Sequence, residues 1–83
     1  MKITLKLFAT LGDLLPSGAK ANAVEIDVED NVTLNQIIQR YKIPPELAHL
    51  VLINGVFSCE ADRDIAALKP GDVLAIWPPV AGG

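Results

Sequence analysis

The sequence has very few of the side chains on which most catalytic and metal sites depend. Its 83 residues include one cysteine, Cys59, and one histidine, His49. One cysteine cannot form an internal disulfide, which fits a reducing, cytoplasmic location. A Cys–His pair would activate a thiolate, but His49 borders an apolar run and Cys59 follows a short strand, so surface and packing roles are favoured. Two residues also fall short of the four ligands of structural zinc.

Basic residues and long apolar runs are scarce as well. Seven Lys and Arg against ten Asp and Glu give a net charge of −3, whereas non-specific nucleic-acid binding needs a basic surface. The apolar runs are too short to span a membrane, and no secretory signal opens the chain. There is no phosphate-binding loop, and the acids of residues 60–64 lack the glycine and terminal glutamate of a calcium loop. We therefore expect no bound cofactor, no metal, no nucleic acid and no independent catalysis.

What the chain does have is a strong hydrophobic pattern, with 51% hydrophobic residues, enough for the core of one small domain. Residues 2–8 and 24–29 alternate polar and apolar side chains, which predicts two strands with one face on the core. Residues 50–53 are continuously apolar and predict a strand covered on both faces or near the sheet centre. Asn54-Gly55 predicts a hairpin back into residues 56–57, and residues 73–77 predict the last strand.

One segment carries the signature of a substantial helix. Thr33 is placed as the N-cap, and Gln36 three residues later completes a capping box, with Val32 and Ile37 placed for a hydrophobic staple. An apolar stripe follows at helical spacing, and the prolines after Ile43 end the helix. Shorter helical turns are expected at residues 9–15 and 65–68, and residues 69–72 predict a turn.

The order of elements predicts an α+β fold of the β-grasp (ubiquitin-like) type. We expect a mixed sheet of four to five strands packed on one main helix, with the first and last strands side by side and parallel. Residues 1–77 form this domain. Residues 78–83 form an extended, flexible C-terminal tail, because two prolines are followed by Val-Ala and then Gly82-Gly83.

The tail is the best candidate for chemistry. A free α-carboxylate is ionised at neutral pH and is a poor acyl donor. If a partner adenylates it with ATP, AMP becomes the leaving group, and the Gly83 carbonyl can accept sulfur or an amine. Glycine suits this role because no side chain hinders attack. The alternative is an idle, frayed chain end.

Three segments together resemble the MoaD/ThiS family of ubiquitin-like sulfur carriers. Residues 71–83 read Gly-Asp-Val-Leu-Ala-Ile-Trp-Pro-Pro-Val-Ala-Gly-Gly, residues 51–55 read Val-Leu-Ile-Asn-Gly, and residues 3–9 read Ile-Thr-Leu-Lys-Leu-Phe-Ala. The resemblance spans essentially the whole chain and is greatest to the small subunit of molybdopterin synthase. Residues 43–46, Ile-Pro-Pro-Glu, are also similar to the carrier of thiamin synthesis.

The resemblance implies specific partners and roles. An E1-like enzyme adenylates Gly83 with ATP, a sulfur donor system makes the thiocarboxylate, and the large synthase subunit transfers the sulfur to cyclic pyranopterin monophosphate within a heterotetramer. Gly83 matches the sulfur-bearing residue. The remaining partner-binding candidates are Gly82, Ala81, Val80, Pro79, Pro78, Trp77, Phe8 and Phe57. For the three aromatic residues, Phe8, Phe57 and Trp77, core positions are an equal alternative.

Other interpretations of the function remain open. The carrier can serve thiamin thiazole, tungsten-cofactor or tRNA thiolation pathways. A ubiquitin-like modifier would join Gly83 to lysines of target proteins and uses the same adenylation step. In a plain binding domain the tail would be incidental.

Overall fold

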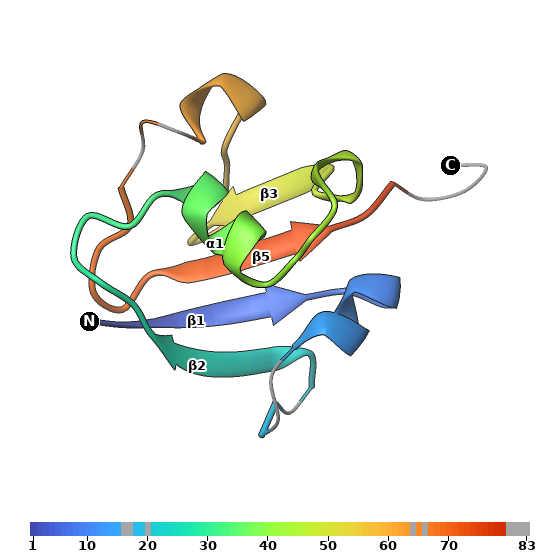
Figure 1. The fold of residues 1–83 in the computed structure, drawn as a ribbon, viewed down its shortest axis with the longest axis horizontal. Coiled ribbons are helices and arrows are strands. Elements are labelled where there is room, and N and C mark those ends of the chain that lie inside the picture. The colour runs from blue at the N-terminus through green and yellow to red at the C-terminus, as the bar shows by residue number, and fades with distance from the viewer. Residues whose placement is uncertain (16–17, 20, 64, 66, 80–83) are drawn as a thin grey trace.

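The protein folds as a five-stranded mixed sheet with one α-helix on one face (Figure 1). The structure is a computed structural model that describes residues 1–15, 18–19, 21–63, 65 and 67–79. The sheet order is β2-β1-β5-β3-β4. The elements are β1 (Lys2–Leu7), β2 (Ala23–Asp27), α1 (Leu34–Arg40), β3 (Leu50–Ile53), β4 (Val56–Phe57) and β5 (Val73–Trp77). Three 3-10 turns join them: η1 (Ala9–Leu14), η2 (Pro45–Leu47) and η3 (Glu60–Asp62).

The two ends of the chain meet in the middle of the sheet. β1 pairs with β5 in parallel, and Leu5 lies opposite Leu74. β1 also pairs antiparallel with β2, and β5 with β3. This parallel pairing of the first and last strands around a single helix is the β-grasp fold that the sequence predicts.

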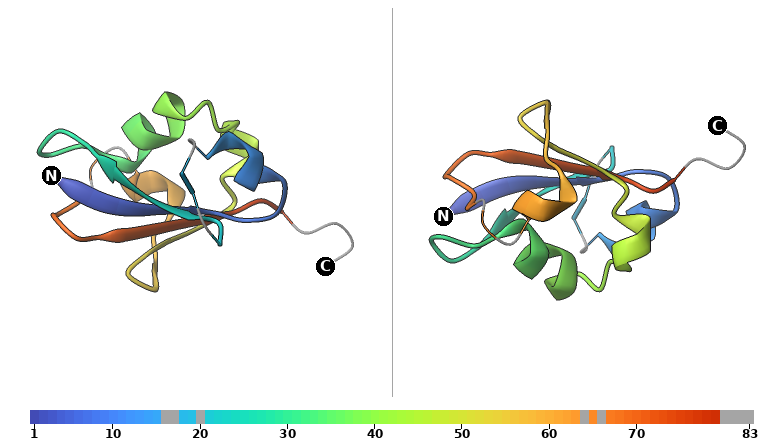
Figure 2. Two further views of the ribbon diagram at one scale, coloured as in Figure 1. Left: turned by 90° about the horizontal axis from the view of Figure 1, so that it is seen from below. Right: turned by 90° about the horizontal axis from the view of Figure 1, so that it is seen from above.

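The core lies between the sheet and α1. Strand residues that alternate in sequence share this face, so Leu5 and Leu7 of β1 and Leu74 and Ile76 of β5 are fully buried. Figure 2 shows α1 and η1 on the same side of the sheet, and no α-helix of the described chain covers the other side. One face of the sheet therefore remains available for contacts with other molecules.

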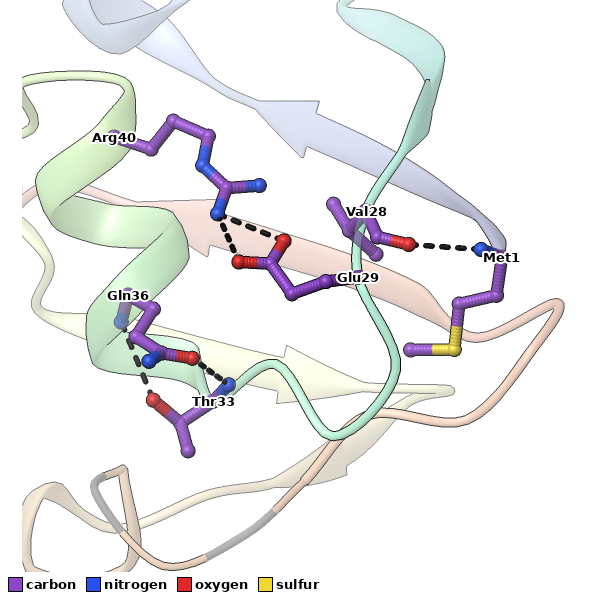
Figure 3. Close-up of polar contacts among 6 residues, drawn as sticks. All are labelled: Met1, Val28, Glu29, Thr33, Gln36 and Arg40. Carbon is purple, nitrogen blue, oxygen red and sulfur yellow. Dashed lines mark hydrogen bonds and ion pairs between the residues drawn. The ribbon is translucent and has the colours of Figure 1, made fainter.

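The start of α1 matches the predicted capping box (Figure 3). The backbone N–H of Gln36 donates to Thr33 Oγ1 at 3.3 Å, and the backbone N–H of Thr33 donates to Gln36 Oε1 at 2.9 Å. Val32 and Ile37 are both completely buried, in keeping with the predicted staple. The helix ends earlier than the prolines, since Lys42 adopts a left-handed conformation with φ of 57°.

Arg40 at the end of α1 reaches across to Glu29, which follows β2 (Figure 3). The closest contact between the guanidinium and the carboxylate is 2.6 Å. The hydrogen bond from Arg40 lowers the pKa of Glu29 from its ordinary value. Both side chains are exposed, so this pair contributes little to stability, although it fixes where the chain passes from sheet to helix.

The two alternatives for the strand at residues 50–53 have different outcomes. β3 lies beside the central strand β5 and has a neighbour on each side, as expected for a strand near the sheet centre. The expectation of cover on both faces is wrong, because Leu50 is 38% exposed and only Val51 is fully buried. The helical turn expected at residues 65–68 lies earlier, at η3. Ala67 instead forms a bridge with Thr33, and the N–H of Leu68 donates to Val32 O. These contacts hold Ala67 and Leu68 in an extended path beside the start of α1.

Thr33→Ala is expected to lower the free energy of unfolding by about 1 kcal/mol, because the backbone N–H of Gln36 loses its acceptor, Thr33 Oγ1, at the start of α1. Thr33→Ser keeps the hydroxyl and serves as the matched control, with a much smaller loss. Urea denaturation followed by circular dichroism measures both. Equal losses in the two variants would show that the methyl group, not the cap, is responsible.

Candidate functional site

The C-terminal end of β5 is held on both sides. The N–H of Phe8 donates to Ile76 O at 3.2 Å, and the N–H of His49 donates to Trp77 O at 3.2 Å. The next two residues are prolines, which have no amide donor, so the ladder ends at Trp77 as the sequence predicts. Pro78 is buried and Pro79 is exposed. The chain therefore leaves the sheet from a fixed point at the end of its central strand (Figure 1).

An aromatic pair lies at this exit point. The rings of Phe8 and Trp77 stack with centroids 4.2 Å apart and planes 1° from parallel. Both side chains are half-buried. They are brought together by the parallel register of β1 and β5, because Phe8 follows β1 directly where Trp77 ends β5. Stacked aromatic pairs of this kind are worth about 0.5–1.5 kcal/mol beyond the area that they bury.

The strand register continues this surface across the face opposite α1. Leu50 lies opposite Trp77, and Leu52 lies opposite both Ala75 and Phe57. Residues opposite each other in a ladder point to the same face. Phe57 is 59% exposed. We call the surface formed by Phe8, Leu50, Leu52, Phe57 and Trp77 the apolar face.

The other half of the same sheet face is charged. Lys2 lies opposite Asp27, and Thr4 lies opposite Glu25. Lys2, Glu25 and Asp27 are exposed, and Lys6 on the same face is half-buried. A sheet face that is apolar over β3, β4 and β5 and charged over β1 and β2 has the composition of a protein-binding surface with a polar rim.

The two residues considered for nucleophilic chemistry have other contacts. The thiol of Cys59 donates to Asp62 Oδ2 at 3.2 Å on the surface. His49 is exposed, and its backbone N–H donates a hydrogen bond to Trp77 O. Within the described ranges, no group of three or more His, Cys, Asp or Glu residues is placed to hold a metal ion. No helix in that same part of the chain is long and apolar enough to cross a membrane.

The predicted partner-binding residues divide into three groups. Phe8 and Trp77 stack together. Phe57 is in β4 on the same sheet face, and β3 lies between β4 and β5. None of these three is a fully buried core residue. Pro78 and Pro79 form the exit, with only Pro79 exposed. The other four predicted residues, Val80, Ala81, Gly82 and Gly83, lie outside the described residues.

Sequence reasoning missed part of the apolar face and one buried residue beside it. Leu50 and Leu52 belong to the apolar face, but their continuous apolar run predicts burial on both sides. Arg63 is buried and lines a pocket beside this face. The signal for it was an arginine within an otherwise acidic connection.

Comparison with known proteins assigns the family. The sequence model of the ThiS family matches residues 5–83. The chain belongs to the ThiS family. The match runs from within β1 through the final glycine. It contains residues 51–55 and 71–83 in full and residues 5–9 of the first segment noted in the sequence, together with the exit point of the tail. This confirms membership in the family of ubiquitin-like sulfur carriers that the sequence resembles.

Solved structures of several other proteins share the fold. The Haloferax volcanii HVO 2177 protein is 26% identical with a TM-score of 0.76, over 100% of this chain and 87% of that one. SAMP1 from the same organism is 27% identical with a TM-score of 0.66, over 100% of both chains. A complex of subunits 1 and 2 of molybdopterin-converting factor from Helicobacter pylori contains a chain 20% identical, with a TM-score of 0.58 and full coverage of both chains. No curated protein sequence matches the chain.

Phe8→Leu is expected to lower the free energy of unfolding by about 1 kcal/mol, because it removes the stacked ring beside Trp77 but keeps an apolar side chain. Phe57→Leu is the matched control, since Phe57 is exposed, and its effect should stay within about 0.5 kcal/mol. Denaturation followed by the fluorescence of the single tryptophan measures both variants. An effect of Phe57→Leu as large as that of Phe8→Leu would contradict the importance of the stack.

Proposed function

We propose that this ThiS-family protein carries sulfur as a thiocarboxylate on Gly83. The observation that carries the proposal is the family match, which extends through residue 83 and so includes the Gly-Gly end. The geometry of β5 supports it, because the tail starts from a strand end held by hydrogen bonds on both sides. A carrier needs a fixed base and a side-chain-free end, since the partner enzymes supply the catalysis.

The proposed chemistry has two steps. The Gly83 carboxylate attacks the α-phosphate of ATP in an E1-like partner, forming an acyl adenylate and releasing pyrophosphate. A sulfur donor system then supplies hydrosulfide, which attacks the Gly83 carbonyl carbon. The C–O bond to AMP breaks, AMP leaves, and loss of the S–H proton gives the thiocarboxylate. The carboxylate alone is unreactive because it is ionised and has only oxide as a leaving group. ATP is consumed by the partner and is not a cofactor of this chain.

The acceptor that we propose is cyclic pyranopterin monophosphate, with this protein as the small subunit of molybdopterin synthase. Support comes from the paired prolines before the Gly-Gly end and from the shared fold with subunit 1 of the Helicobacter pylori molybdopterin-converting factor, whose structure was solved with subunit 2. In this role the tail enters the active site of the large subunit. Carriers for thiamin thiazole and other thiolation pathways differ only in the acceptor.

The apolar face is the proposed docking surface for these partners. It begins at the stacked rings at the base of the tail and continues to Phe57. A partner that binds this face is therefore next to the point where the tail leaves the sheet. The charged half of the sheet forms the rim of the contact.

A second candidate is a protein modifier joined through Gly83 to lysine side chains. The specific observation in its favour is the likeness to SAMP1, which is a small archaeal modifier protein, at 27% identity over the whole of both chains. Adenylation is common to both functions. The modifier differs in that a lysine amine, not a sulfur nucleophile, forms the new bond to the Gly83 carbonyl carbon.

Incubation with the cognate E1-like enzyme, ATP and a sulfur donor should raise the intact mass by the difference between sulfur and oxygen. A chain lacking Gly83 should show no increase while its circular dichroism spectrum remains unchanged. Intact mass spectrometry measures the change. An unchanged mass of the full chain under conditions where the enzyme consumes ATP would refute the carrier function, and lysine-linked adducts in cells would establish the modifier.

Phe57→Ala is expected to weaken binding to the large synthase subunit by roughly tenfold or more, because an exposed aromatic anchor on the docking surface is lost. Val56→Ala is the matched control, since Val56 is the preceding residue, is 69% exposed and points to the opposite sheet face. Isothermal titration calorimetry gives both affinities. Equal weakening by the two variants would place the interface elsewhere.

A further inference from the structure

Arg63 is a buried residue whose Nε donor has no acceptor among the described residues. Its residue exposure is only 6%, and its Nε atom is buried without a hydrogen-bond acceptor. The single ion pair within the described part of the chain joins Arg40 to Glu29 and does not involve Arg63. Its backbone carbonyl accepts a hydrogen bond from Asn35 N at 3.2 Å, which fixes the residue next to α1.

The Nε donor is the costly group. A buried donor without an acceptor gives up the hydrogen bond that it makes to water in the unfolded chain. A buried Nε with no acceptor among the described residues is an exception that needs an explanation, and a group bound in an adjacent pocket is one.

The surroundings of Arg63 form a pocket large enough for such a group. The cavity has a volume of about 550 Å³ and is lined by Pro45, Glu46, Ala48, His49, Phe57 and Arg63. It lies between η2 and the residue that follows η3. Its volume is within the range of pockets that bind small molecules, about 300–1,000 Å³.

We propose that this pocket binds an oxyanion, either a carboxylate or a phosphate group, through the guanidinium of Arg63. The fork of arginine matches two oxygens of such a group, and a contact that uses Nε would satisfy the unpaired donor. His49 offers a second polar side chain at the wall of the pocket. This site is separate from the chemistry of Gly83, whereas the choice of its occupant rests on the docking surface of the proposed function.

Two features relate the pocket to the apolar face. Phe57 belongs to both, and His49 is hydrogen-bonded through its backbone to Trp77 at the base of the tail. An acidic side chain of a protein bound on the apolar face would be in reach of Arg63. Glu46, an exposed carboxylate in the wall, opposes a free anion and favours a carboxylate delivered by a docked protein.

The test measures anion binding to the ¹⁵N-labelled wild-type protein by NMR. Inorganic phosphate and acetate are titrated separately at constant ionic strength, with chloride as the reference ion. We expect a saturable shift of the Arg63 Nε–H signal and only a linear drift of Arg40, the exposed control that is already paired with Glu29. Saturation by phosphate at much lower concentration than by acetate identifies a free phosphate ligand. Similar, weak saturation by both identifies a site for a docked protein's carboxylate.

Variants of Arg63 provide an independent readout. Because phosphate stabilises many proteins by exclusion from their surface, the informative quantity is the difference from wild type. Arg63→Met should lose the extra rise in Tm that phosphate gives over chloride, while its Tm in chloride is equal to or above that of wild type, since an unsatisfied buried donor has been removed. Arg63→Lys should weaken the anion effect several-fold.

Two results would overturn the proposal. One is an Arg63 Nε–H signal that responds to both anions no differently from Arg40. The other is a large loss of Tm in chloride for Arg63→Met with no change in the phosphate effect, which would mean that the guanidinium is satisfied within the fold. The NMR measurement uses the wild-type chain, so it decides the question even if Arg63→Met does not fold.

Discussion

The parallel pairing of β1 with β5 is the interaction on which the rest of the structure depends. It joins the first strand of the chain to the last and places Leu5, Leu7, Leu74 and Ile76 side by side under α1. The same register brings Phe8 to Trp77 and sets the point at which the chain leaves the sheet. The core, the aromatic pair and the exit point of the tail all depend on this one register. A shift of the register by one residue would turn the side chains of the shifted strand to the opposite face of the sheet and disrupt all three.

Most of the fold was predictable because its signals are local. Alternation in β1 and β2, the capping box at Thr33 and Gln36, and the Asn54-Gly55 turn each depend on residues close in sequence, and each is confirmed. Asn54 and Gly55 both have the positive φ angles that this turn requires. The parallel centre of the sheet followed from the order of elements and the family resemblance together.

The wrong predictions concern contacts between distant segments. The run from Leu50 to Ile53 has no alternation, so nothing in it shows that one of its faces is open to solvent. The turn at η3 and the extended path of Ala67 are decided by the start of α1, some thirty residues away in sequence. Arg63 is buried by packing that no local pattern records. The chemical role of the tail was inferred from its composition and its family, whereas the apolar face and the Arg63 pocket required the three-dimensional arrangement.

The position of β5 has a mechanical consequence. Chain ends are usually the first segments to open, because few contacts hold them. Here the segment that precedes the tail is the central strand, with a neighbour on each side and a hydrogen bond to each neighbour at its last two residues. Tension applied to Pro79 is therefore shared by two ladders at once. Under the proposed carrier function, a partner that draws in the tail would therefore load the central strand of the sheet.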